Sequence, residues 1–247
     1  MMPPRPLKPK RKPISNDLTL KKYHLTGKTN NQKHYIKTIN QHGITFCVGP
    51  AGTGKTHIAV ASAIIRLAKK QCDRIIITRP FVQAGENTGF LPGDIQQKSD
   101  PYMRPIYDEL NVYCSLADIQ RMLNGNQIEV LPFAYMRGRS LHNSFIIADE
   151  CQNATFEQIT MLLTRIGNNS TMVLTGDISQ TDLEAHRSGG LEKYMRILNG
   201  VGEVGLVELT NEDIIRSPLV EVIVKAVEDY NVKEKEEAKA DRDKAAD

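Results

Sequence analysis

Short, mostly apolar runs alternate along the chain with longer segments whose apolar residues recur every three or four positions. Runs rich in β-branched residues and only four to six residues long are typical of buried strands. Six of them lie at residues 44–48, 74–78, 128–131, 144–148, 171–175 and 204–209. The alternation of such runs with helical segments predicts an α/β fold.

The helical segments follow from spacing and from their end signals. Residues 57–70 contain no Gly or Pro and carry apolar residues on nearly every face, which is typical of a covered helix. Further helices are predicted after residues 29–32, over 101–113 and 115–123, from the Thr155–Gln158 capping box to Gly167, and after Ser217-Pro218 with Leu219, Val220, Ile223 and Val227 inward. The segment 81–105 is rich in Gly and Pro and is predicted to be a functional loop.

The segment between the first strand and the helix 57–70 carries the clearest chemistry. It reads Gly49-Pro50-Ala51-Gly52-Thr53-Gly54-Lys55-Thr56 and fits the Walker A pattern GxxxxGK[ST]. Glycines let such a loop turn its N–H groups toward phosphate oxygens, and the helix N-terminus adds partial positive charge. Lys55 would reach the β- and γ-phosphates, and Thr56 would place its hydroxyl on Mg²⁺. The strand–loop–helix setting favours this nucleotide site over a glycine-rich turn without function.

An acidic pair, Asp149-Glu150, directly follows the run 144–148. An apolar strand ending in Asp-Glu is the Walker B pattern, in which Asp149 would hold Mg²⁺ opposite Thr56. Glu150 could polarise a water for attack on the γ-phosphate. A plain acidic turn is the alternative, and the phosphate loop upstream favours the catalytic interpretation.

Two glutamines are further candidates. Gln180 follows the run 171–175 and could detect the γ-phosphate, with Asp177 supporting its loop. Gln32 lies upstream of the first strand and could recognise adenine, because a carboxamide both donates and accepts hydrogen bonds. An ordinary place on a helix surface explains Gln32 equally well.

Charge and composition add a basic arm and exclude some classes. Residues 1–37 contain ten Lys or Arg and one Asp, a balance of +9, which leaves −6 for the remainder of a chain of net charge +3. Residues 1–28 are predicted to be a disordered basic arm that grips phosphate backbones or only aids solubility, and residues 231–247 a charged tail. The four cysteines are widely spaced, which favours buried free thiols and a cytoplasmic location, and no membrane span is expected.

Seven segments together resemble the PhoH family of P-loop ATPases. They are GPAGTGKT (49–56), TRPFVQAGENTGFLPGD (78–94), KSDPYMRPIYDEL (98–110), MRGRSL (136–141), FIIADECQNAT (145–155), LTGDISQTDL (174–183) and ELTNEDIIRSPLV (208–220). The family takes its name from induction by phosphate starvation. Ser140 and Ser217 stand where the family pattern has Thr and His, and neither change removes a group that the nucleotide chemistry needs.

The resemblance implies one RecA-like domain over residues 29–230, with a mostly parallel central sheet and helices on both faces. It also implies ATP and Mg²⁺ as cofactors and a ring-shaped homo-oligomer, often a hexamer. Some relatives carry an N-terminal nuclease domain and act on RNA, but the predicted core begins near residue 29, so nuclease activity is not expected.

The first functional hypothesis is an oligomeric, helicase-like ATPase that acts on RNA or single-stranded DNA. Hydrolysis commonly needs an arginine finger, and Arg216 from a neighbouring subunit is the first candidate. Arg79, Arg137 and Arg139 are alternatives, or they line a nucleic-acid path. The second hypothesis is a nucleotide-dependent switch or scaffold that regulates a protein partner. A small-molecule kinase fits poorly because Glu150 would recruit water, and a Rossmann oxidoreductase fits worse because the loop lacks GxGxxG.

Overall fold

The six predicted strands form a single sheet in which every neighbouring pair is parallel. The computed structural model describes residues 24–80, 95–181, 183, 189–215, 219–220 and 222–223. The strands are β1 (Ile44–Val48), β2 (Arg74–Arg79), β3 (Ile128–Pro132), β4 (Ser144–Ala148), β5 (Thr171–Gly176) and β6 (Val204–Glu208). Their order across the sheet is β3-β2-β4-β5-β1-β6, so β5 separates β1, which leads into the glycine-rich loop, from β4, which ends at the acidic pair.

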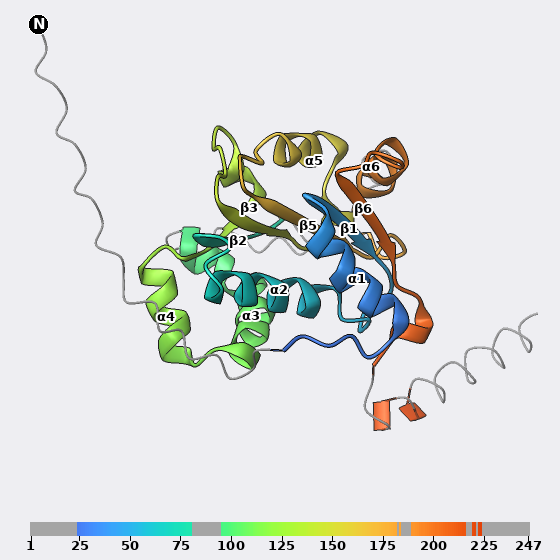
Figure 1. Cartoon of the computed structure of the whole chain (residues 1–247), viewed down its shortest axis with the longest axis horizontal. Helices are drawn as coiled ribbons and strands as arrows, with labels where there is room; N and C mark the ends of the chain where they lie inside the picture. Colours follow the sequence, from blue (N-terminus) through green and yellow to red (C-terminus); the bar gives the residue numbers. More distant parts are fainter. Residues whose placement is uncertain are drawn as a thin grey trace, which may run out of the picture.

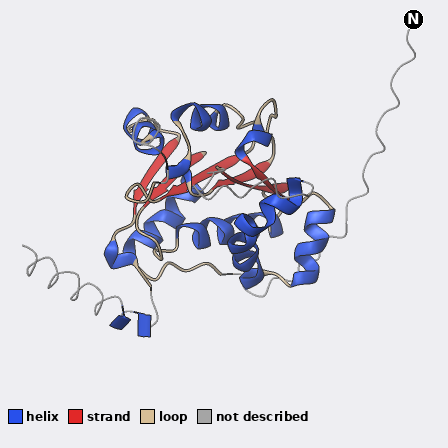
Figure 2. Ribbon diagram, turned by 180° about the vertical axis from the view of Figure 1, so that it is seen from behind, coloured by secondary structure: helices blue, strands red, loops and turns tan. Residues whose placement is uncertain are grey.

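Helices cover both faces of this sheet (Figures 1 and 2). One face carries α1 (Asn30–Gln41), α2 (Lys55–Ala68), α3 (Ile95–Tyr113) and α4 (Leu116–Asn124), and the other carries α5 (Phe156–Leu163) and α6 (Gly190–Ile197). Short 3₁₀ turns occur at η1 (Phe133–Met136), η2 (Cys151–Asn153) and η3 (Asn211–Asp213). The layers and the strand order confirm the predicted RecA-like α/β fold.

Alternation along the strands explains why both faces need helices. In β2, Ile75 and Ile77 pack into the cluster beneath α1 to α4, whereas Ile76 packs into the cluster beneath α5 and α6. β4 repeats the pattern, with Phe145 and Ile147 on one side and Ile146 on the other. Strands that are apolar at every position are therefore buried on both faces, as expected for a parallel sheet.

Helix limits differ from the sequence prediction at three places. α2 begins at Lys55, two residues early, and α5 stops at Leu163, four residues before Gly167. α3 begins at Ile95, inside the segment predicted to be a loop, and residues 81–94 lie outside the described part. Two prolines had suggested a boundary near residues 101–105, but packing at fully buried Ile106 and Leu110 holds the helix together.

Two further differences concern the C-terminal third. α6 was not predicted, because its buried apolar side chains are only Leu191 and Tyr194, too narrow a stripe to recognise. The prediction that Leu219, Val220 and Ile223 point inward is wrong, since they are 69%, 41% and 53% exposed. Residues 216–218 and Val227 lie outside the described part of the chain.

The cysteine prediction is confirmed: Cys47, Cys72, Cys114 and Cys151 are all free and buried. Within the residues that the structure describes, no helix has the length and apolarity needed to cross a membrane.

A buried carboxylate ties η3 to the start of α1. Asp213 is 1% exposed, and its carboxylate accepts hydrogen bonds from the Thr29 hydroxyl, from Asn31 Nδ2 at 2.9 Å and from the Thr210 N–H at 2.7 Å. Burial by itself would raise the pKa of Asp213, but these hydrogen bonds outweigh it and hold the pKa below its ordinary value. The ionised carboxylate therefore stabilises the junction of α1 and η3.

We expect Asp213→Asn to lower the free energy of unfolding by about 1–3 kcal/mol at pH 7, because buried donors lose a charged acceptor. The folded pKa is the lower one, so this stabilisation is complete above the ordinary pKa of about 4 and is lost as pH falls through the folded value. Urea unfolding at pH 7 and at lower pH measures both effects. The exposed neighbour supplies the control, Glu212→Gln, which should change stability little. A difference between wild type and Asp213→Asn that persists unchanged at low pH would contradict this account.

Candidate nucleotide-binding site

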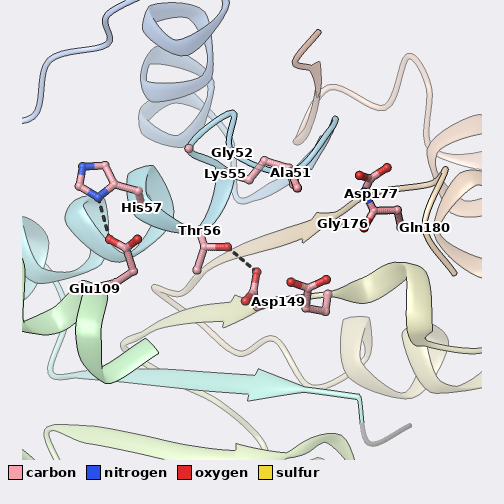
Figure 3. Close-up of a pocket in the computed structure, with 12 residues that line it drawn as sticks. Ala51, Gly52, Lys55, Thr56, His57, Glu109, Asp149, Gly176, Asp177 and Gln180 are labelled. Carbon is pink, nitrogen blue, oxygen red and sulfur yellow. Dashed lines mark hydrogen bonds and ion pairs between the residues drawn. The ribbon is translucent and has the colours of Figure 1, made fainter. Parts of the chain in front are cut away.

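A cavity of about 340 Å³ lies at the ends of β4 and β5, beside the glycine-rich loop (Figure 3). Its walls come from that loop, the first turn of α2, the tips of the two strands and one residue of α3. The lining residues are Ala51, Gly52, Gly54, Lys55, Thr56, His57, Glu109, Asp149, Glu150, Gly176, Asp177 and Gln180. Segments that are distant in the sequence therefore converge where ligands bind in open α/β sheets.

The loop owes its curled shape to two glycines. Gly49 has φ 153°, and a Cβ there would lie 2.4 Å from the Leu209 carbonyl oxygen. Gly54 caps α2 in the left-handed conformation, with φ 85°. A residue with a side chain would be strained at Gly54 and would collide at Gly49, so the sequence pattern and the backbone path agree.

Lys55 folds back over its own loop. Its Nζ donates to the carbonyl oxygens of Gly49 at 2.5 Å and of Pro50 at 2.7 Å. Burial lowers the pKa of Lys55 below its ordinary value, while the nearby Asp177 acts in the opposite direction. A phosphate group would offer this half-buried ammonium a full negative charge in place of carbonyl dipoles.

The two Walker motifs meet through a direct hydrogen bond. Thr56 Oγ1 donates to Asp149 Oδ1 at 2.8 Å (Figure 3). The same oxygen accepts from Thr175 Oγ1 at 2.6 Å, and Thr175 belongs to β5, the strand that separates the two motifs. Asp149 is therefore buried and held from both sides. Thr175 was not recognised from the sequence, because an apolar run with one threonine shows no chemical signal.

Arg79, at the end of β2, bridges the acidic pair. Its Nη2 lies 3.0 Å from Asp149 Oδ2 and 3.0 Å from Glu150 Oε1. Gln152 Nε2 donates to the other oxygen of Glu150 at 2.6 Å. A cation therefore already balances the two carboxylates in this structure.

The backbone of Glu150 is strained. Its φ of 57° and ψ of 38° lie in the left-handed region, which costs a residue with a Cβ roughly 1–2 kcal/mol. Such outliers cluster at active sites, where the fold holds a side chain in a working position. The strained residue carries the carboxylate that the sequence predicts to be the general base.

The loop after β5 presents a second buried acid to the cavity. Asp177 is 6% exposed, and its Oδ1 accepts from the Ser179 N–H at 3.0 Å and from Ser179 Oγ at 2.6 Å. Its Oδ2 is buried and has no hydrogen-bond partner among the described residues. Gln180 lines the same cavity from this loop. The sequence predicted only that Asp177 supports the loop of Gln180. In the structure, Asp177 also brings the acceptor Oδ2 to the site.

Gln32 lies beside the loop and is not among the residues that line the cavity. It is 3% exposed, its Nε2 donates to the carbonyl oxygens of Thr53 at 3.0 Å and Asp213 at 3.4 Å, and its Oε1 accepts from the Lys28 N–H. Recognition of adenine by Gln32 would require some of these bonds to be exchanged.

The predicted arginines are spread over the molecule. Arg216 lies outside the described residues. Arg139 forms an ion pair with Glu129 of β3 at 2.7 Å. Glu129 also forms an ion pair with Arg74 at 3.0 Å. Arg137 is exposed. Of the four arginines, only Arg79 contacts the acidic pair in the described structure.

The residues present fit a magnesium–nucleotide complex. Thr56 and Asp149 supply oxygen ligands, and Asp177 Oδ2 adds a buried acceptor without a partner among the described residues. Mg²⁺ prefers oxygen, keeps several waters and usually takes only one or two protein carboxylates together with phosphates. Among the described residues, no cluster of three or more His, Cys, Asp or Glu suited to a metal occurs.

One wall of the cavity was not foreseen. His57 Nδ1 lies 2.7 Å from Glu109 Oε2, and His57 Nε2 lies 3.0 Å from the Tyr113 hydroxyl. Glu109 and Tyr113 belong to α3, so this network connects α3 to the first turn of α2; Figure 3 shows the contact between His57 and Glu109. Neither residue follows a motif with a known chemical role, so sequence reasoning had no basis for placing them at the site.

Comparison with known proteins agrees with the sequence motifs. A family model described as "PhoH-like protein" matches residues 24–228. The chain is 50% identical over 201 residues to a PhoH-like protein of Synechocystis sp., covering 81% of this chain and 61% of that protein. It is 43% identical over 204 residues to a PhoH-like protein of Bacillus subtilis, with coverage of 83% and 64%, and 44% identical over 190 residues to Protein PhoH of Escherichia coli K12, with coverage of 76% and 54%.

The chain thus spans 54–64% of the length of these three relatives. Among solved structures, the UvsW helicase of bacteriophage T4 aligns with a TM-score of 0.43 at 16% identity, covering 74% of this chain and 59% of that one. That likeness is too distant to bear on activity.

We expect Arg79→Ala to lower the melting temperature in EDTA and to enlarge the rise in melting temperature that Mg²⁺ produces. Removing one partner of a buried pair costs roughly 3 kcal/mol, because Asp149 and Glu150 are left as neighbouring uncompensated charges. A divalent cation would then restore the balance. Thermal unfolding with and without Mg²⁺ measures both effects.

The matched control is Arg196→Ala, which breaks only an exposed pair with Glu192 and should behave as wild type. An equal Mg²⁺ response in Arg79→Ala and wild type would show that the guanidinium and the metal do not share these carboxylates.

Proposed function

The chain belongs to the PhoH family, and we propose that it is a P-loop ATPase that binds ATP with Mg²⁺ and hydrolyses it. The observation that carries the proposal is the 2.8 Å hydrogen bond from the Thr56 hydroxyl to Asp149. It brings together the phosphate loop and the acidic strand tip across the intervening strand β5. A metal bound to both groups would touch the triphosphate at the point where its charge must be neutralised.

In this proposal the loop residues 49–56 hold the phosphates, and Lys55 turns from its own carbonyls to the β- and γ-phosphates. Thr56 and Asp149 hold Mg²⁺, which when bound neutralises phosphate charge and makes the γ-phosphorus easier to attack. Gln32 is proposed to contact adenine from the other side of the loop. Helix α2, which begins at Lys55, holds these groups in place before the nucleotide binds.

Glu150 is proposed to accept a proton from the attacking water. Hydrogen bonds from Arg79 and Gln152 orient its carboxylate, and its strained backbone keeps it at the cavity. Gln180 and the free oxygen of Asp177 lie on the same cavity wall and could orient that water. A general base beside the γ-phosphate favours hydrolysis over phosphoryl transfer to a small molecule.

A single chain supplies little positive charge for the transition state. Lys55 is the only lysine or arginine among the described residues that line the cavity. An arginine finger adds about 10³- to 10⁵-fold in rate where one is used. We therefore propose a homo-oligomeric ring, of six subunits as the family resemblance implies, in which Arg216 reaches the neighbouring subunit's nucleotide.

RNA or single-stranded DNA is the proposed substrate, and the protein is proposed to act in the cytoplasm. Tyr135 lies on η1, which follows β3, and Arg137 is the residue directly after this turn; both are exposed. Tyr135 is 47% exposed, and Arg137 makes no ion pair with the described residues. An exposed aromatic ring and an exposed guanidinium two positions apart suit stacking on bases and contact with phosphate. Arg139 is less suited because Glu129 already holds it.

A second candidate function is a nucleotide-dependent switch or scaffold for a protein partner. The observations that favour it are a hydrogen bond that holds the loop to the segment after β6 and a group of exposed apolar residues that follows this segment in the sequence. The Ile215 N–H donates to the Gly52 carbonyl at 3.2 Å, and the described residues that follow include Leu219, Val222 and Ile223, all more than half exposed. Slow basal turnover together with nucleotide-dependent binding of another protein would favour this function.

The test of the ATPase proposal compares two variants. We expect Lys55→Ala to lose retention of Mg²⁺–ATP. Glu150→Gln should keep that retention but lose about 10²- to 10⁴-fold in turnover, because only proton abstraction is removed. Equilibrium binding and steady-state phosphate release measure the two effects separately. If Lys55→Ala retains Mg²⁺–ATP as wild type does, the proposed site is wrong.

The test of the substrate compares ATP turnover with and without RNA and single-stranded DNA at low salt, with solution mass measured alongside. We expect stimulation, and we expect Arg137→Ala to weaken strand binding by several-fold, because one phosphate or stacking contact is lost. The matched control is Arg121→Ala, another surface arginine, which is held by Asp118. No stimulation by any strand would contradict the nucleic-acid proposal and leave the switch as the better candidate.

A further inference from the structure

The wall formed by His57, Glu109 and Tyr113 has a hydrogen-bonding capacity that the ATPase mechanism does not use. Glu109 Oε2 is bound to His57 Nδ1 at 2.7 Å, and the far side of the ring contacts the buried Tyr113 hydroxyl at 3.0 Å. The imidazole is thus fixed between two residues of α3. Glu109 Oε1 makes no hydrogen bond with the described residues, and its side chain is 31% exposed.

The position of this wall follows from the order of groups along the cavity. Asp177 and Gln180 lie at one end, Thr56 and Asp149 lie between, and His57 with Glu109 lies at the other end (Figure 3). A triphosphate gripped by the loop has its γ-phosphate toward the general base and the β5 tip. Its α-phosphate and nucleoside must then extend toward His57, the residue that follows Thr56 in the first turn of α2.

A carboxylate beside a bound triphosphate needs a compensating partner. Glu109 can only accept hydrogen bonds when ionised, and its charge repels phosphate. The nucleoside carries the donors that would offset this repulsion, on the sugar hydroxyls and on the amino group of the base. Gln32 is less suited to these donors, because its Nε2 can only donate and its Oε1 already accepts a hydrogen bond from the Lys28 N–H.

From this geometry we propose that Glu109 reads the nucleoside by accepting a hydrogen bond from a sugar hydroxyl or from the base amino group, with His57 as the residue that positions it. This inference rests on the proposed binding of ATP and adds a determinant of nucleotide specificity. In this proposal, α3 contributes to recognition of the nucleoside as well as to packing of the fold.

The experiment measures dissociation constants, in Mg²⁺, for ATP, 2′-deoxyATP, 3′-deoxyATP and purine riboside triphosphate, which lacks the 6-amino group. Wild type should bind at least one of the three analogues roughly tenfold more weakly than ATP, since a hydrogen bond to a partly exposed charged group lies at the low end of its range. The analogue that is affected identifies the donor. In Glu109→Met the ratio for that analogue should fall to about one, and Glu109→Gln, which keeps an acceptor of the same shape, should give an intermediate ratio.

Two controls separate recognition from folding and from general charge. Asp108→Asn removes a carboxylate from the same helix at an exposed position outside the cavity and should leave all ratios unchanged. Inorganic tripolyphosphate has no nucleoside, so Glu109→Met should bind it as tightly as wild type or more tightly.

The outcomes separate a failure of this inference from a failure of the proposed function. If wild type binds ATP but the ratios are the same in wild type and in both Glu109 variants, the inference is overturned and the ATPase proposal stands. A purely structural role for the His57–Glu109 pair would give that result, with altered stability only. If wild type does not bind ATP with Mg²⁺, the proposed function fails and this inference fails with it.

Discussion

The site depends on one constraint, the insertion of β5 between the strand that leads to the phosphate loop and the strand that ends in the acids. Adjacent strands lie about 4.8 Å apart, so the tips of β1 and β4 are separated by roughly twice that distance. The gap is wide enough for a phosphate and a metal, yet narrow enough for Thr56 and Asp149 to reach each other. Thr175, on the inserted strand, then fixes the carboxylate that both sides use.

The charges of the site are balanced by partners that a ligand could replace. Lys55 is bound to loop carbonyls, and Arg79 is bound to Asp149 and Glu150. Each of these cations has weaker or more crowded contacts than a phosphate–metal complex would offer. In the proposed function, ligand binding at this site is an exchange of partners, and its free energy is the difference between two sets of charge contacts. Asp177 Oδ2 and Glu109 Oε1 have no hydrogen-bond partner among the described residues, so each could gain a partner without losing another.

The sequence was sufficient for the parts that are local in the chain. Strand positions, the glycine-rich loop and the acidic pair follow from consecutive residues, and the structure has all six strands where they were predicted. Arg79 could be named only as an alternative, because its contact with Asp149 depends on the order of β2 and β4 in the sheet. His57 follows the Walker A motif and Glu109 lies 52 positions away in the family segment 98–110, but neither motif assigns these two residues a role, so only the packing of α3 on α2 could bring them together. The prediction that Leu219 points inward is wrong for a different reason. An amphipathic pattern predicts that one face of a helix is covered, but it does not identify the molecule that covers it.

Hydrogen bonds from three neighbouring segments hold the loop. α1 holds it through the bond from Gln32 to the Thr53 carbonyl, and β5 through the bond from the Gly49 N–H to the Gly176 carbonyl. The segment after β6 holds it through the hydrogen bond from the Ile215 N–H to the Gly52 carbonyl. A shift of the loop on binding a nucleotide must therefore strain or move that segment. Because packed elements move as units, a shift of a few tenths of an ångström at Gly52 would change the position of this segment's exposed surface, which a neighbouring molecule could contact.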